Sequence, residues 1–240
     1  MPLSVIGESA PRELAGLLTQ HGYRILRLPR NPQLPVAVSA HPDLSVFFAP
    51  DAVYTTTEYA TLAKDELNAV CVAIGRPLRT VTGECGSTYP QDVLLDALPL
   101  GGLLFCLPHA TAPELTAHPA YRVVPVRQGY AKCAALPVGN QALASADPSL
   151  LHAAERNGLE ILSLGAGGIR LPGYDSGFIG GTASFAPYGG TDTVFFCGNL
   201  AGYSDGDRLK RFLIAHGLKF WDLPMFPMTD IGTVFLFSEE

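Results

Sequence analysis

The chain has 240 residues and a formal net charge of −6 at pH 7, with 48% hydrophobic and 16% charged residues. This composition suits one domain with a full hydrophobic core, and it excludes nucleic acid as an expected partner, because no basic face is available to neutralise phosphates. No apolar run approaches a membrane span, and the first residues lack the basic and apolar regions of a signal peptide, so we expect no membrane partner.

One pattern occurs five times along the chain: a helix that ends at glycine or a turn, an apolar strand, and a polar residue before the next apolar run. Repetition of this kind without an internal linker predicts a single domain over residues 1–240. The helices are predicted to end at Gly22, Gly75, residues 118–120, Gly158 and Gly217. The strands that follow them are predicted over residues 23–28, 78–82, 121–126, 159–164 and 218–223.

Helix boundaries follow from capping residues and from apolar residues at helical spacing. Asp147 before Pro148 is typical of a helix start, and Asn157 before Gly158 is typical of a helix end. The other helices are predicted over residues 9–22, 57–75 and 204–217, with a single turn over residues 111–118.

Short apolar runs predict a second set of strands that are covered on both faces, because they show no alternation with polar residues. These runs are residues 46–48, 93–95, 103–106, 178–179, 194–197 and 234–237. The chain also begins with a lone strand at residues 3–6, while the last repeat stops after one strand at residue 237. We therefore predict that the two end strands pair and close the repeats into a ring, as propellers close theirs.

A ring of five such units resembles the pentein, or α/β-propeller, fold of the guanidino-group modifying enzymes. The residues that carry the resemblance are Gly-Tyr-Ala-Lys-Cys at 129–133 and Leu-Pro-Gly-Tyr-Asp-Ser-Gly-Phe-Ile-Gly-Gly at 171–181. The resemblance implies an α/β fold with five-fold pseudosymmetry. That superfamily includes arginine deiminases, amidinotransferases and a non-catalytic ribosome factor, so the fold alone does not assign a function.

The resemblance also implies which residues would catalyse the usual reaction: a Cys near the C-terminal end, a mid-chain His, and carboxylates that grip the guanidinium. A thiolate is needed because the resonance-stabilised cation accepts only a strong nucleophile. The corresponding C-terminal stretch, residues 229–235, contains no Cys, and Ala131 stands where the His would be. We therefore expect no deimination of free arginine.

Five polar residues occupy equivalent places in the repeats, and each is expected to open a strand around the ring axis: Asp43, Asp92, Lys132, Asp175 and Asp230. In a closed ring, four carboxylates and one ammonium would converge on a central pocket. Asp175 is the predicted main anchor for a cation, because nearby glycines allow close approach and Tyr174 can lie over a flat guanidinium. The alternative interpretation is that each Asp only bonds its own backbone in a turn.

Cys133 is the candidate nucleophile of a relocated active site, because the ammonium of Lys132 is its neighbour. The alternative is a buried strand cysteine that faces away from Lys132, since successive strand residues point to opposite faces. His41 and Asp43 are a candidate ligand or acid–base pair, but no Cys/His cluster accompanies them, so no metal and no cofactor are predicted. The five cysteines include no CxxC pair and indicate reduced thiols in a cytoplasmic protein.

Three functions stay open at this point. The first is a binding protein or pseudoenzyme whose acidic axial pocket holds a small cationic guanidino or amino ligand. The second is an active hydrolase or transferase with Cys133 as nucleophile, and the third is a non-catalytic scaffold. Thiol reactivity and turnover separate the first two, and an open central pocket separates both from the third. The sequence does not define an oligomeric state.

Overall fold

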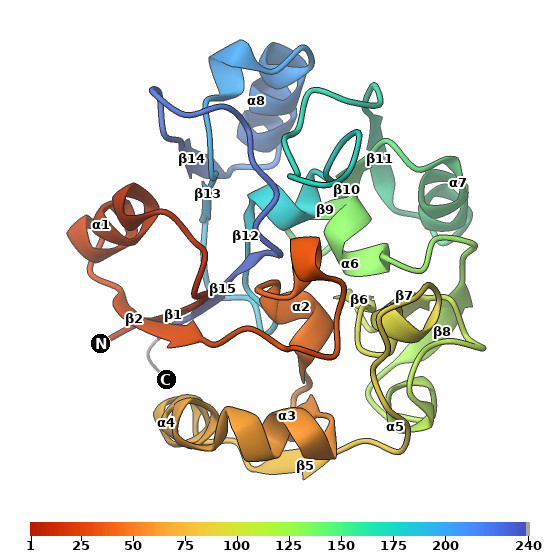
Figure 1. The fold of residues 1–240 in the computed structure, drawn as a ribbon. Helices are drawn as coiled ribbons and strands as arrows, with labels where there is room; N and C mark the ends of the chain where they lie inside the picture. The colour runs from red at the N-terminus through yellow and green to blue at the C-terminus, as the bar shows by residue number, and fades with distance from the viewer. Residues whose placement is uncertain (239–240) are drawn as a thin grey trace.

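The computed structural model describes residues 1–238, and the strands of this part of the chain form five small β-sheets (Figure 1). In spatial order, the sheets are β12 (Ser184–Phe185), β15 (Val234–Phe237), β1 (Leu3–Gly7) and β2 (Arg24–Leu28); β3 (Val46–Phe48), β4 (Val53–Thr55) and β5 (Leu78–Thr80); β6 (Leu98–Leu100), β7 (Leu103–Cys106) and β8 (Arg122–Pro125); β9 (Ala135–Val138), β10 (Ala142–Ser145) and β11 (Glu160–Ser163); and β13 (Thr193–Phe195) with β14 (Lys219–Trp221). The architecture is a mixed α/β fold.

The longer helices lie at the periphery and short helical turns lie nearer the centre, as Figure 1 shows for α2 and α6. The peripheral helices are α1 (Arg12–Gln20), α3 (Thr57–Leu62), α4 (Lys64–Ile74), α5 (Pro113–Thr116), α7 (Pro148–Arg156) and α8 (Gly206–Ala215). The short turns are η1 (Val36–Val38), α2 (Pro42–Ser45), η2 (Gln91–Val93), α6 (Ala131–Ala134), η3 (Gly180–Thr182) and η4 (Leu200–Gly202). Among residues 1–238, no helix has the length and hydropathy that a bilayer crossing requires.

The predicted helices are confirmed, with one division. The Asp147 carboxylate accepts hydrogen bonds from the backbone N–H groups of Ser149 and Leu150 and so caps α7. Gly75 ends α4 in the left-handed conformation with φ of 63°, which glycine adopts without strain. The helix predicted over residues 57–75 is two helices, because the backbone leaves helical geometry at Ala63.

Five hydrophobic cores separate the sheets, and each contains one peripheral helix or helix pair. The cores follow the sheets in order and the last one returns to the first sheet: α3 and α4 lie between the β1 and β3 sheets, α5 between the β3 and β6 sheets, α7 between the β6 and β9 sheets, α8 between the β9 and β13 sheets, and α1 between the β13 and β1 sheets. Every sheet is therefore covered on both faces, which explains why the strands read as continuous apolar runs.

The predicted pairing of the end strands is confirmed. β1 pairs antiparallel with β15, with Leu3 opposite Phe237 and Val5 opposite Phe235, and it pairs parallel with β2 on its other edge. Leu3 and Val5 enter the core of α4, whereas Ile6 enters the core of α1. The first strand of the chain thus joins two cores that the last strand also joins.

Two predicted strands are absent from the structure. Val93 ends η2 and residues 94–95 form the turn after it, while residues 178–179 precede η3. The expectation that five polar residues open strands is wrong: Asp43, Asp92 and Lys132 lie in the short turns α2, η2 and α6, and Asp175 and Asp230 lie outside helices and strands. A short apolar run does not distinguish a buried strand from a buried helical turn, since both are apolar on every face.

We predict that the joint formed by β1 is necessary for stability. Ile6 has no exposed surface, so Ile6→Ala should lower the free energy of unfolding by roughly 2–5 kcal/mol through lost burial and the cavity left behind. Val72→Ala is the matched control at an 84% exposed position, where a change within about 0.5 kcal/mol is expected. Urea denaturation measures both, and equal stability of the two variants would contradict the prediction.

Candidate functional site

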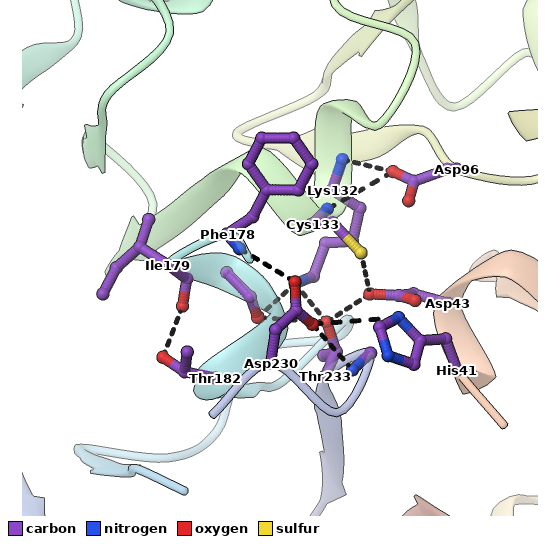
Figure 2. Close-up of polar contacts among 12 residues, drawn as sticks. His41, Asp43, Asp96, Lys132, Cys133, Phe178, Ile179, Thr182, Asp230 and Thr233 are labelled. Atoms are coloured by element: carbon purple, nitrogen blue, oxygen red, sulfur yellow. Dashed lines mark hydrogen bonds and ion pairs between the residues drawn. The ribbon is translucent and has the colours of Figure 1, made fainter. Parts of the chain in front are cut away.

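A cluster of polar side chains lies buried at the centre of the molecule, where the segments that lead into several strands meet (Figure 2). None of its members is more than 4% exposed. We define this central polar cluster as His41, Asp43, Asp96, Lys132, Cys133, Asp230 and Thr233. Buried ionisable groups in this number require partners or a ligand, because an uncompensated charge is costly away from water.

The α6 turn directs two consecutive residues toward the cluster. Residues along a helix are about 100° apart, so Lys132 and Cys133 need not face opposite sides as they would on a strand. The Asp96 carboxylate, just before β6, accepts hydrogen bonds from the backbone N–H groups of Lys132 at 2.5 Å and Cys133 at 3.4 Å. The alternative in which Cys133 faces away is therefore wrong, and its thiol lies in the cluster.

Asp43 is the hub of the side-chain contacts. Its Oδ2 accepts hydrogen bonds from the Thr233 hydroxyl at 2.6 Å and from the Cys133 thiol at 2.9 Å. The Lys132 ammonium donates to the Thr233 hydroxyl at 2.8 Å and lies 3.4 Å from the Gly180 carbonyl oxygen. The Thr233 hydroxyl thus bridges Lys132 and Asp43 by two hydrogen bonds.

Thr233 occupies an unusual backbone conformation. Its φ is 74°, and no other non-glycine residue in the described range 1–238 has a positive φ. A β-branched residue is strained there, at a cost of order 1–3 kcal/mol, and persists only where surrounding contacts fix it. The bridge from Lys132 to Asp43 is the contact that this conformation makes.

Glycines let the backbone close around Asp230 and His41. A Cβ added to Gly181 would lie 1.9 Å from Asp230 Oδ1, and one added to Gly232 would lie 2.3 Å from His41 Cβ. Gly181 therefore permits close approach of the backbone to Asp230 at the centre. Asp230 accepts hydrogen bonds from the Phe178 N–H at 2.8 Å and the Gly232 N–H at 3.1 Å, and its Oδ1 lies 3.7 Å from His41 Nδ1.

The cluster has more negative charge and more acceptors than its own residues satisfy. Three carboxylates, those of Asp43, Asp96 and Asp230, lie near one ammonium, that of Lys132. Asp43 Oδ1, Asp96 Oδ2 and His41 Nδ1 are buried and have no hydrogen-bond partner among the described residues. Since buried polar atoms in folded proteins are nearly all bonded, these three mark a place for a further group.

Burial and mutual repulsion shift the protonation equilibria of the cluster. Burial, and to a lesser extent repulsion by the Asp43 carboxylate, raises the pKa of Asp96 well above its usual range. Burial also raises the pKa of Asp230. Burial likewise lowers the pKa of Lys132, against the attraction of Asp43. Burial and the nearby carboxylates raise the pKa of the Cys133 thiol well above its usual range. Cys133 is therefore a neutral thiol at pH 7 in this arrangement, which is the opposite of an activated nucleophile.

One small cavity adjoins the cluster, and a larger cavity lies beyond it. A cavity of about 10 Å³, lined by Asp43, Lys132 and Phe185, has room for a single water molecule. It shares Pro99, Phe185 and Pro187 with a larger cavity of about 550 Å³. Elsewhere beside the cluster, three loops pack on Leu44 of α2 through an apolar group of Leu34, Val38, Cys85 and Leu171.

The structure brings together five of the predicted site residues: His41, Asp43, Lys132, Cys133 and Asp230. Asp92 is buried but is bonded to the Tyr130 hydroxyl instead. Tyr174 and Asp175 are exposed, and Figure 2 draws no hydrogen bond or ion pair between either of them and the described residues of the cluster.

Two members of the cluster were not predicted as site residues, Asp96 and Thr233. Each carries a signal that the sequence offers: Asp96 directly precedes the apolar run 97–100, and Thr233 directly precedes the apolar strand β15.

We predict that Lys132 is needed to compensate the buried carboxylates. Lys132→Met should lower the free energy of unfolding by about 3–5 kcal/mol, because removing one partner leaves buried charge without compensation. Lys64→Met, at an exposed position, is the matched control and should change stability little. Urea denaturation at pH 7 measures both, and an unchanged Lys132→Met variant would show that the carboxylates are neutral without the ammonium.

We also predict that Cys133 reacts slowly with alkylating reagents. Its thiol is 2% exposed and bonded to Asp43, whereas Cys71 is partly exposed and serves as an internal reference. Mass spectrometry of protein treated with iodoacetamide at pH 8 should find Cys71 modified first and Cys133 modified only after denaturation. Modification of Cys133 in the native protein as fast as Cys71 would reveal an accessible thiolate.

Solved structures with similar folds include several enzymes that act on arginine derivatives. Dimethylarginine dimethylaminohydrolase, in an adduct with S-methyl-L-thiocitrulline, superposes with a TM-score of 0.52 at 11% identity, covering 92% of this chain and 91% of that one. A mutant of DDAH from Pseudomonas aeruginosa in complex with citrulline gives 0.51 at 10% identity, with the same coverage. A cyanobacterial arginine dihydrolase gives 0.53 at 12% identity over all of this chain but only 40% of its own.

These likenesses establish the pentein, guanidino-modifying fold for this chain, and at such identities they establish the fold alone. No curated protein sequence matches the chain. One family model matches residues 5–235, nearly the whole length. The chain therefore belongs to the family of unknown function DUF6873.

Proposed function

We propose that this chain is a binding protein or pseudoenzyme of the guanidino-modifying fold, and that its central polar cluster holds the guanidino or amino group of a small cationic ligand. The observation that carries the proposal is the excess of buried carboxylates over ammonium, together with the unpartnered Asp43 Oδ1 and Asp96 Oδ2. A guanidinium supplies planar donors that match such oxygens in charge-assisted pairs.

The proposed site depends on how the five sheets surround it. The five cores that follow one another between the sheets favour a five-fold pseudosymmetric propeller, folded as a single domain over residues 1–240 and closed by β1 and β15. The five cysteines are free of disulfides, which favours a reducing, cytoplasmic compartment. No nucleic acid, membrane or cofactor enters this proposal.

The ligand's route follows from the cavities. The cavity of about 550 Å³ is within the size range of small-molecule pockets and reaches the cluster past Phe185 and Pro187. The inner cavity admits only a water-sized group, so binding of a guanidinium requires side chains to move apart. Asp43 lines the inner cavity and is the buried anchor of this proposal, whereas Tyr174 and Asp175 line neither cavity.

The resemblance of the fold to a protein with citrulline bound supports a ligand of this size. Two other functions have weaker support. A hydrolase or transferase with Cys133 as nucleophile is favoured by the closeness of His41 and Asp43 to the thiol, but the raised pKa of Cys133 opposes it. A non-catalytic scaffold is favoured by the small volume of the inner cavity. The unpartnered buried oxygens favour a ligand over both.

We predict that calorimetry will distinguish a cationic from a neutral ligand. Arginine or agmatine should bind at least about tenfold more tightly than citrulline, since a hydrogen bond to a charged group contributes about 1.5–3 kcal/mol. Asp43→Asn should abolish this preference, and Asp175→Asn, the same change at an exposed site, should preserve it. Thermal melts of each variant establish that it is folded.

Two results would decide against this assignment. Equal affinity for arginine, agmatine and citrulline would remove the carboxylate anchor. A greater loss in Asp175→Asn than in Asp43→Asn would move the anchor to the exposed segment, as the sequence alone had predicted. Release of citrulline and ammonia from arginine, lost in Cys133→Ser, would instead establish the catalytic alternative.

A further inference from the structure

We propose that His41, Asp43 and Cys133 form a binding site for one transition-metal ion, with zinc as the ion that fits the three donors best. The inference uses the same buried cluster as the proposed function but does not depend on its organic ligand. Cys133 is 90 residues from Asp43 in the chain, so only the fold brings the three together.

The donor atoms are already near coordination geometry. One ring nitrogen, one carboxylate oxygen and the sulfur lie within 4.8 Å of one another, and all three residues are buried. Bond lengths of about 2.0–2.3 Å place neighbouring donors of a tetrahedral zinc roughly 3.3–3.6 Å apart. Side-chain shifts of about 1 Å would therefore form the site without a change in the backbone.

Unpartnered atoms point to the same place. Asp43 Oδ1 and His41 Nδ1 belong to side chains that are 2% and 4% exposed, and neither atom has a hydrogen-bond partner within residues 1–238. Asp43 Oδ1 can therefore bind an ion while Oδ2 keeps its bond to Thr233. Lys132, the positive group of the cluster, is directed to Thr233 and Gly180 and leaves the three donors free of an ammonium.

The charge of the cluster favours a divalent cation. Three carboxylates and one ammonium leave two negative charges when all are ionised, and loss of the Cys133 proton on metal binding adds a third, so a divalent ion reduces the net charge of the cluster from −3 to −1. On binding, the ion takes the place of the proton that the Cys133 thiol now donates to Asp43 Oδ2, and this proton passes to the buffer.

The donor types select the ion. Thiolate with imidazole and carboxylate suits zinc, whereas magnesium and calcium take oxygen donors. Three protein ligands also leave a fourth position for water or a small ligand, as in zinc sites that act on substrates.

The test uses the full chain, treated with chelator and titrated with zinc or cobalt sulfate. We expect one zinc per chain after desalting, measured by elemental mass spectrometry, and a near-ultraviolet thiolate-to-cobalt absorption band. Cys133→Ser should lose the band. Loss of an outer partner of a metal ligand weakens binding by roughly 10- to 100-fold, and both Cys133→Ser and His41→Asn should weaken zinc binding by more than this. Cys106→Ser, a buried core cysteine, is the control and should keep both properties.

Either of two outcomes overturns the inference. One is a wild-type protein that gives no thiolate-to-cobalt band, a result that depends on no variant and so on no variant's folding. The other is wild-type zinc affinity in folded Cys133→Ser, which would assign the metal to surface groups such as the exposed His109. Calorimetry with arginine or agmatine on the chelator-treated protein keeps the proposed function separate, because each ligand can fail while the other binds.

Discussion

The burial of three carboxyl groups beside a single ammonium at the centre of the molecule is the constraint on which the rest of the structure depends. Asp43, Asp96 and Asp230 have almost no exposed surface, and water is not available to solvate them. Their burial must be offset by hydrogen-bond donors. The chain supplies the Lys132 ammonium, the Thr233 hydroxyl, and the backbone N–H groups of α6, Phe178 and Gly232. What these donors leave unsatisfied defines the site.

Apolar burial in the surrounding cores stabilises the fold and offsets the free-energy cost of burying the polar cluster. Each core lies between two sheets and encloses a peripheral helix, so the fold's apolar burial is independent of which polar residues meet at the centre. This separation explains how chains of 10–12% identity share the fold while residues 229–235 contain no Cys and Ala131 stands where the resemblance expects His. Such a fold constrains function only through its central residues.

The sequence predicted the repeating elements well because each depends on local signals. Caps such as Asp147 and Gly75 and the apolar strands act within a few residues, and the pairing of β1 with β15 follows from the half-unit at each end. The centre was harder to predict because it depends on how many residues separate each polar residue from the strand that follows it. Asp43 and Lys132 each lie three residues before a strand, but Asp175 lies nine residues before β12, and Gly181 occupies the matching place. A shift of four residues replaces Asp92 with Asp96, which lies two residues before β6.

That Gly181 fills the position of a fifth polar residue has a physical reason. A side chain there would meet Asp230 Oδ1 at 1.9 Å from its Cβ, so the approach of the backbone to Asp230 excludes one. The cluster is therefore asymmetric: His41, Asp43 and Cys133 hold donor atoms within 4.8 Å of one another, whereas Gly181 contributes no side chain beside Asp230. The three donors are grouped rather than spread evenly around the axis. A compact cation suits such a grouping better than a large one, so the metal ion and the organic cationic group that we propose would compete for the same place.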